Sequence, residues 1–139
     1  MNTTTEASNN TTKAVAKKKK AIKLPFGILY VTTTSNNTHV TLTDQQWNKV
    51  IGGGTGLVSF KWAKQSTPYA AEVLTQHLMK EAKEQFGLKQ IRLILRGVGL
   101  GRDGVFKGIN NIWGIDIMSI SEATGIQFGG CQWIRPKRN

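Results

Sequence analysis

The most recognisable chemical motif is a glycine-rich turn, Gly99-Leu100-Gly101-Arg102-Asp103-Gly104, which reads G-x-G-x-x-G between a predicted strand and a predicted helix. In dinucleotide-binding folds this spacing places a pyrophosphate at a helix N-terminus, and an acidic residue about 20 positions further on binds the ribose. Here Asp116 follows Gly104 after only 12 positions and begins its predicted strand. A tight strand-to-helix turn is therefore favoured over a nucleotide site. Arg102 beside exposed N–H groups also fits a phosphate clamp.

Other arrangements that would support catalysis or metal binding are weak. The run Gly52–Gly56 is not followed by the Gly-Lys-Ser/Thr of a phosphate-binding P-loop. Two histidines and a single cysteine, Cys131, are too few for a metal cluster. Asp44, Asp103 and Asp116 lie at the ends of separate predicted elements, and nothing pairs them for acid–base chemistry. We therefore expect no enzyme activity, no cofactor and no metal site.

Basic and aromatic side chains gather in two segments that suit nucleic acid better. Lys61-Trp62-Ala63-Lys64 comes just before Ser66-Thr67-Pro68, a hydroxyl-and-proline signal for a helix start. Cations, a ring and the positive end of a helix dipole can meet one phosphate backbone there. Near the end of the chain, Trp133 precedes the basic run Arg135–Arg138. Aromatic and arginine planes stack on unpaired bases, so these segments favour RNA over duplex DNA.

The net charge is concentrated at the two ends of the chain. The 139 residues include 19 Lys and Arg against 8 Asp and Glu, a formal net charge of +11. Residues 1–25 hold six lysines and one acid, 129–139 hold three cations and no acid, and 26–128 hold ten bases and seven acids. Charged tails on a nearly neutral domain favour a polyanion as partner. We divide the chain into a lysine-rich extension at 1–25, a domain at 26–128 and a basic tail at 129–139.

An anionic membrane surface is the rival polyanion. The lysine block Lys17, Lys18, Lys19 and Lys20 would bind anionic lipid at about 1 kcal/mol per lysine. Its neighbours lack the apolar face of an interfacial helix, however. No apolar run approaches the roughly 20 residues of a bilayer span, and Met1–Thr12 lacks the apolar core of a secretory signal. We expect the two tails to be disordered, or ordered only by RNA.

Periodicity predicts the elements that must position these residues. Strands are expected at 26–34, 38–43, 47–51, 91–95 and 115–120, and Ser119 is expected to point inward in the last of them. A long helix should run from Ser66–Pro68 to a cap at Gly87, and a shorter one from a cap at Asp103 to Gly114. The order β-β-β-α-β-α-β predicts a mixed α/β sheet with helices on its faces, three layers in all.

Four groups of residues occur in the order and spacing typical of one protein family. They are Ser35-Asn36-Asn37-Thr38 in the first hairpin, Lys64–Ala71 at the long helix, Gly97–Arg102 before the short helix, and Gly130-Cys131 with Arg135–Arg138 at the end. Over about residues 26–139 the chain resembles the small-subunit ribosomal protein S-eleven family. The resemblance implies a ribonuclease-H-like mixed α/β fold without nuclease activity. It also implies a structural role on the platform of the small ribosomal subunit, bridging rRNA helices near the cleft where mRNA leaves.

The resemblance and the basic segments together give the expected rRNA contacts. By position in the family these are Asn36, Asn37, Lys61, Lys64, Ser66, Arg102, Arg135, Lys137 and Arg138. Trp133 is added as a stacking ring, and Lys17–Lys20 are a further candidate. The partners implied are small-subunit rRNA and the neighbouring platform proteins of the S-eighteen and S-seven families, with mRNA nearby and no membrane.

The sequence departs from the family pattern in two places. Val98 and Leu100 stand where the family's turn usually has prolines, and Phe128–Ile134 replaces side chains expected around the cysteine. With Trp113 and Trp133 and the Lys/Asn-rich extension, this drift favours a mitochondrial ribosome, with a plastid or bacterial ribosome as the alternative. Two other functions stay open: a nucleotide-binding enzyme using the G-x-G-x-x-G turn, and a lipid-surface module using the N-terminal lysines.

Overall fold

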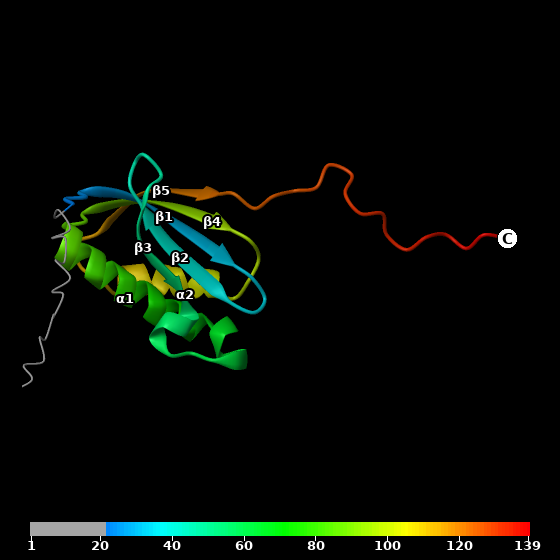
Figure 1. Ribbon diagram of the computed structural model, residues 1–139, viewed down its shortest axis with the longest axis horizontal. Helices are drawn as coiled ribbons and strands as arrows, with labels where there is room; N and C mark the ends of the chain where they lie inside the picture. Colours follow the sequence, from blue (N-terminus) through cyan, green and yellow to red (C-terminus); the bar gives the residue numbers. More distant parts are fainter. Residues whose placement is uncertain (1–21) are drawn as a thin grey trace, which may run out of the picture.

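The structure is a computed structural model that describes residues 22–139. Lys17–Lys20, and most of the extension predicted at 1–25, lie outside the described residues. The elements are β1 (Phe26–Thr33), β2 (Thr38–Thr43), β3 (Lys49–Gly54), the 3-10 turns η1 (Thr55–Val58) and η2 (Trp62–Ser66), α1 (Pro68–Phe86), β4 (Gln90–Arg96), α2 (Gly101–Asn110) and β5 (Asp116–Glu122). The predicted mixed α/β class and the order of strands and α-helices along the chain are confirmed (Figure 1).

The five strands form one mixed sheet in the order β3-β2-β1-β4-β5. β2 is antiparallel to both of its neighbours, whereas β1, β4 and β5 are mutually parallel. Parallel strands end at the same edge of a sheet, so β1, β4 and β5 all deliver their following residues to one edge. We call this edge the loop end and define it as residues 34–37, 55–67 and 97–100.

Both helices cover the same face of the sheet. Leu74 of α1 and Val105 of α2 share one core with Leu29 and Leu93 of the central strands, and Figure 1 shows both helices beneath the sheet. The prediction of three layers is therefore wrong for residues 22–139, which form two layers. The reason is handedness: both crossovers, β3 to β4 and β4 to β5, advance in the same direction across the sheet, and right-handed connections then fall on one side.

The ends of α1 follow their sequence signals, and those of α2 do not. Thr67 caps α1 by accepting a hydrogen bond at Oγ1 from the N–H of Ala70 over 3.3 Å. Gly87 ends that helix in the left-handed conformation, with φ of 66°. α2 begins at Gly101, two residues before the predicted cap, so Asp103 lies within its first turn. At this position the positive end of the helix dipole still stabilises the carboxylate.

Two strand predictions are corrected by the register of the sheet. Gly52–Gly54, which follow the strand expected at 47–51, belong to edge strand β3 and pair with β2. β5 contains an irregularity, because the pairing passes from Ile91 with Ile117 directly to Arg92 with Ser119. One extra residue in a strand reverses the side on which the following side chains lie. Ser119, expected to point inward, therefore shares the helix-free face with Arg92.

Glycines allow α2 to lie against the sheet and α1 at very short range. A Cβ added to Gly101 would lie 2.0 Å from Oγ1 of Thr38, and one added to Gly104 would lie 2.0 Å from the carbonyl oxygen of Pro68. Real Cβ atoms cannot approach other atoms so closely, so both positions require glycine. The glycines of the G-x-G-x-x-G sequence thus serve packing, and this space is filled by the protein itself.

Replacing Gly104 with alanine should lower the free energy of unfolding by about 1–3 kcal/mol, the usual cost of overpacking. The atom that the new methyl group would meet is a backbone carbonyl oxygen, which cannot rotate away. Alanine's better helix propensity offsets at most about 1 kcal/mol. Urea unfolding followed by circular dichroism measures the change. Gly125→Ala is the matched control, because no atom lies within 4 Å of its added Cβ; equal stability of the two variants would contradict the prediction.

Candidate nucleic-acid interface

Buried Thr55 joins two of the predicted contact segments at the loop end. Its side chain is completely buried, and its hydroxyl donates to Oδ1 of Asn37 over 2.6 Å. The same Oγ1 lies 3.3 Å from the carbonyl oxygen of Gln65 in η2. The Asn36-Asn37 turn and the segment that carries Lys61 and Lys64 are therefore neighbours, although they are far apart in sequence.

The Asn36-Asn37 turn is held by Thr34. Thr34 Oγ1 accepts hydrogen bonds from the backbone N–H groups of Asn36 and Asn37, over 3.4 and 3.1 Å, and the Thr34 N–H donates to the Asn37 carbonyl oxygen over 2.9 Å. Asn36 is exposed. Asn37 is half-buried, and its Oδ1 also accepts from the N–H of Thr38 over 2.8 Å. Asn36 is thus the freer of the two amides to meet a partner.

Two lysines and a tryptophan are exposed just before α1: Lys61, which immediately precedes η2, and Trp62 and Lys64 within η2. Trp62 is 88% exposed and has φ of 57°, in the left-handed region that bulky residues rarely adopt. Such backbone strain concentrates at sites with a functional demand. Ser66, the last residue of η2, donates its hydroxyl proton to the Ala63 carbonyl oxygen over 3.0 Å, so it could meet RNA only as an acceptor.

The N-terminus of α1 lies beside these cations. Phe60 packs edge-on against Tyr69 of the first turn, with ring centroids 5.9 Å apart and planes at 82°. The hydroxyl of Thr67 also donates to the carbonyl oxygen of Lys64 over 2.8 Å. The positive end of a helix dipole with two exposed lysines beside it favours an anion such as a phosphate group.

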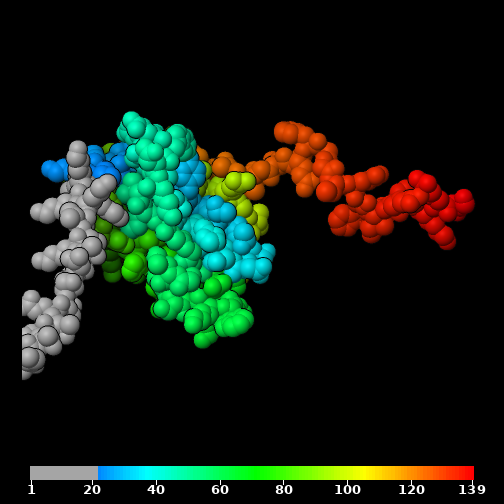
Figure 2. All heavy atoms as spheres, viewed as in Figure 1, coloured from blue at the N-terminus to red at the C-terminus, as the bar shows by residue number. Residues whose placement is uncertain are grey.

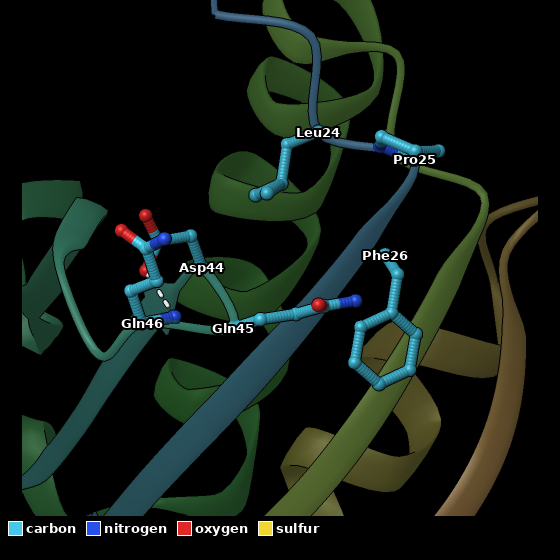
Figure 3. A pocket seen from close by; sticks show the side chains of 6 residues that line it. All are labelled: Leu24, Pro25, Phe26, Asp44, Gln45 and Gln46. Carbon is cyan, nitrogen blue, oxygen red and sulfur yellow. Dashed lines mark hydrogen bonds between the residues drawn. The ribbon is translucent and has the colours of Figure 1, made fainter.

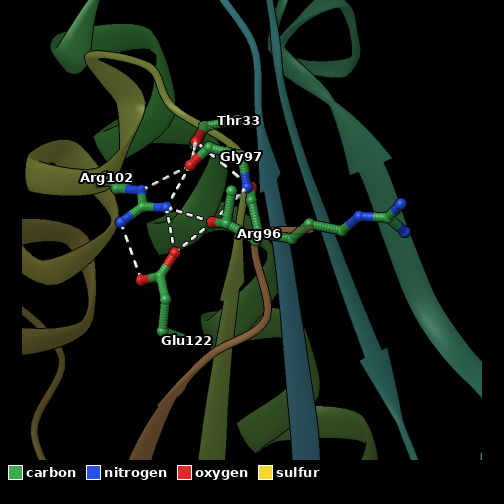
Figure 4. Close-up of polar contacts among 6 residues, drawn as sticks. Thr33, Arg96, Gly97, Arg102 and Glu122 are labelled. Atoms are coloured by element: carbon green, nitrogen blue, oxygen red, sulfur yellow. Dashed lines mark hydrogen bonds and ion pairs between the residues drawn. The ribbon is translucent and has the colours of Figure 1, made fainter. Parts of the chain in front are cut away.

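Arg102 belongs to a network within the protein (Figure 4). Its Nη1 and Nη2 pair with the two carboxylate oxygens of Glu122 at 2.9 and 2.6 Å, and its Nε donates to the carbonyl oxygen of Gly97 over 2.8 Å. Nη2 also donates to the hydroxyl of Thr124 over 3.0 Å. The guanidinium group, followed by the Thr124 hydroxyl, lowers the pKa of the Glu122 carboxyl below its ordinary value. We call this network the clasp: Arg102, Gly97, Glu122 and Thr124.

The tail leaves the domain directly after the clasp. Figures 1 and 2 show the residues that follow β5 as an arm extending away from the sheet. Trp133 is 86% exposed, and the three cations Arg135, Lys137 and Arg138 are exposed as well. An arm without acidic residues and with an exposed ring has the composition that suits RNA.

A shallow hollow lies at the opposite end of the sheet, beside the turn between β2 and β3 (Figure 3). Its one carboxylate, Asp44, accepts hydrogen bonds from the N–H groups of Gln46 and Asn48, over 2.8 and 2.9 Å, and from the Asn48 side chain over 3.1 Å. The Asn48 bonds are the main reason that the Asp44 pKa is lowered. Asp44 therefore shapes a turn, and the hollow lacks a second carboxylate to act with it.

Two further findings concern residues 22–139 as a set. No three His, Cys, Asp or Glu side chains within this range gather as metal ligands. Neither helix in the described part of the chain has the length and apolar character needed to cross a membrane.

Sequence reasoning overlooked two residues of this region. Thr55 forms its side-chain hydrogen bonds with residues 18 and 10 positions away in the sequence, and no local sequence pattern predicts such contacts. Arg96 is exposed at the carboxyl end of β4. Its alternation with buried Leu93 and Leu95 would have placed it on an outer face beside the loop end.

Comparison with known proteins identifies the family. The family model described as Ribosomal protein S11 matches residues 27–139, which include nearly all of β1 and every later element. The small ribosomal subunit protein uS11 of Campylobacter fetus is 37% identical over 123 residues, covering 87% of this chain and 92% of the relative. The proteins of that name from Helicobacter acinonychis and Nautilia profundicola are each 35% identical, over 126 and 125 residues, and cover 94% and 93% of those relatives. The chain belongs to the ribosomal protein S11 family.

Proposed function

We propose that this protein is a structural component of the small ribosomal subunit that binds rRNA through its loop end and its arm. Membership of the S11 family gives the structural role in the small subunit. The observation that carries the RNA-binding part is the meeting, through Thr55, of the exposed Asn36 turn with the lysines beside the start of α1. The arm begins near the same edge, at the clasp.

The two parts divide the work of binding. The loop end is rigidly hydrogen-bonded, so it fixes where a phosphate backbone lies relative to the sheet. The arm adds three cations and a stacking ring, which contribute affinity by counterion release and by stacking on unpaired bases. Backbone contacts of this kind position the RNA, and contacts to bases specify it.

The finer location is also part of the proposal. The resemblance supports a place on the platform near the mRNA exit cleft, beside proteins of the S-eighteen and S-seven families. The relatives reported above come from bacteria, which supports a ribosome of bacterial type and fits the bacterial cytoplasm directly. The mitochondrial ribosome favoured by the sequence rests on Trp113, Trp133, the Lys/Asn-rich extension and the departures at Val98, Leu100 and Phe128–Ile134, which are exposed in the structure. The bacterial relatives do not support it directly.

We propose no catalytic activity. A Cβ on Gly99 would lie 2.6 Å from the carbonyl oxygen of Thr34, so the G-x-G-x-x-G turn packs directly on β1 and leaves no space there for a nucleotide. The S11 family is a family of structural proteins. No observation favours the lipid-surface alternative, whose lysines lie outside the described residues.

The double variant Lys61→Gln/Lys64→Gln should weaken binding to a small-subunit rRNA transcript and reduce the log–log salt slope by about 1.4–1.8. That is the slope change expected for the loss of two phosphate contacts. Filter binding at several salt concentrations measures it. Lys80→Gln/Lys107→Gln removes the same charge from exposed positions on the helices and is the matched control. Equal slopes for the two double variants would show that net charge, and not the loop end, binds the RNA.

The arm should contribute both charge and stacking. Replacing Arg135, Lys137 and Arg138 together by Gln should reduce the salt slope by roughly 2–2.7. Trp133→Ala should weaken binding by about 1–3 kcal/mol and leave the slope unchanged, because stacking releases no counterions. The same titrations measure both effects. An unchanged affinity for both variants would exclude the arm from the interface.

Two substitutions in the clasp distinguish a role in directing the arm from a direct contact between Arg102 and RNA. Arg102→Gln removes a positive charge and Glu122→Gln removes a negative one, but each breaks the same bidentate ion pair. If the clasp directs the arm, both variants should weaken rRNA binding, by a few-fold in the dissociation constant. If Arg102 instead meets a phosphate, Arg102→Gln should weaken binding while Glu122→Gln strengthens it. The signs of the two changes in the same assay decide between these roles.

A further inference from the structure

The face of the sheet that carries no helix is organised in rows by the strand register. Arg96 of β4 lies opposite Thr32 of β1, Thr32 opposite His39 of β2, and His39 opposite Gly54 of β3. The next rows on the same face contain, in the same strand order, Ile94, Tyr30, Thr41 and Gly52, and then Arg92, Ile28, Thr43 and Lys49. This face is called the open face below.

The open face is accessible to solvent and has few protruding side chains. Thr32, His39, Arg92 and Arg96 are exposed, whereas the central apolar residues Ile28 and Ile94 are buried beneath their neighbours. A Cβ on Gly54 would lie 3.0 Å from the ring of His39, so glycine keeps this row open. Glycine in a strand marks places where a ligand or backbone approaches closely. The small side chains therefore leave a floor on which a flat ligand can lie.

The charged side chains that β1 to β4 place on the open face have one sign, and Asp116 of edge strand β5, opposite Gln90, is an exposed acid on the same side of the sheet. Strands β1 to β4 carry Lys49, Arg92 and Arg96 and no acidic residue. The side chain of Arg96 extends away from the clasp and across the neighbouring strands (Figure 4). By contrast, the helices carry four of the chain's acids: Glu72, Glu81, Glu84 and Asp103. The two layers thus differ in charge, and the open face is complementary to an anion.

An aromatic pair lies on the same face. Trp47, in the turn between β2 and β3, packs against Tyr30 with ring centroids 5.4 Å apart and planes at 44°. It remains 61% exposed and has φ of 69°, an uncommon conformation for a bulky residue. The hydrogen bonds of Asp44 to Gln46 and Asn48 fix this turn. The protein therefore holds an indole ring at the border of the open face at a cost in backbone strain.

We propose that the open face is a second RNA-binding surface, which takes unpaired nucleotides. Bases stack on Trp47 and lie over the glycine-lined floor, while Arg92, Arg96 and Lys49 bind phosphates. A sheet with exposed rings and cations is a known solution for binding single-stranded RNA. A protein partner is disfavoured because the apolar residues in the centre of this face are buried, whereas protein interfaces have an apolar core depleted of charge. The proposal rests on the proposed rRNA-binding function and adds a second surface to it.

The test uses the full chain and two fluorescein-labelled RNAs: a single strand of about 12 nucleotides, a typical single-strand site size, and a hairpin of mostly paired bases. Arg92→Gln/Arg96→Gln should weaken single-strand binding about tenfold and reduce its salt slope by about 1.4. Trp47→Asn should weaken it about fivefold or more with no change in slope; asparagine tolerates the left-handed backbone. Both variants should bind the hairpin nearly as the wild type does. Fluorescence anisotropy measures all of these affinities.

Lys80→Gln/Lys107→Gln is again the charge-matched control. If the arginine variant binds the single strand no more weakly than this control, the open-face proposal is overturned, whether or not Trp47→Asn folds. If Lys61→Gln/Lys64→Gln weakens rRNA binding and the open-face variants do not, only the open-face proposal fails. If the wild type binds no RNA at low salt, the proposed function fails with it. An arginine variant that binds RNA normally but enters small subunits poorly would overturn the proposal and assign the face to a protein.

Discussion

Both helices pass over one face of the sheet, and most other features of the structure follow from this constraint. Two right-handed crossovers that advance in the same direction must fall on the same side. They create one core, in which Leu29 and Leu93 of the central strands meet Leu74 and Val105 of the helices. They also bring the carboxyl ends of three parallel strands and the starts of both helices to one edge. The loop end and the open face are thus both consequences of topology.

Placing two helices side by side over a five-stranded sheet leaves little room, and glycine resolves the crowding. Gly104 and Gly108 stand one turn apart on α2 and face Pro68 and Thr75 of α1 at distances that no larger residue would tolerate. The spacing of the glycines was visible in the sequence. The sequence alone does not show whether glycine is needed so that a bound phosphate or a backbone carbonyl of the protein itself can approach closely. The absence of a suitably placed acid after the turn was the informative signal, and it favoured packing.

The fold was largely predictable because its signals are local. The Thr67–Pro68 start and the Gly87 end of α1, and the alternation in β2, depend on residues within one or two turns of each other. The features that could not be predicted from the sequence depend on residues that are distant in the chain. Whether Arg102 meets a phosphate or a carboxylate depends on Glu122, 20 positions later, and the side on which Ser119 lies depends on one extra residue in β5. The third layer was wrongly expected because crossover direction was not considered.

A nearly neutral domain can still bind a polyanion when its charges are separated in space. Screening limits an exposed charge to about 8 Å at physiological salt, so a phosphate responds to the few side chains nearest to it and not to the net charge. In this protein the helices carry most of the domain's acids, whereas the loop end and strands β1 to β4 carry lysine and arginine. The one ion pair among residues 22–139, Arg102 with Glu122, is located where the arm begins. In the proposed complex with RNA, this ion pair offsets the negative charge of Glu122 where the arm begins, so that the carboxylate repels phosphate groups less.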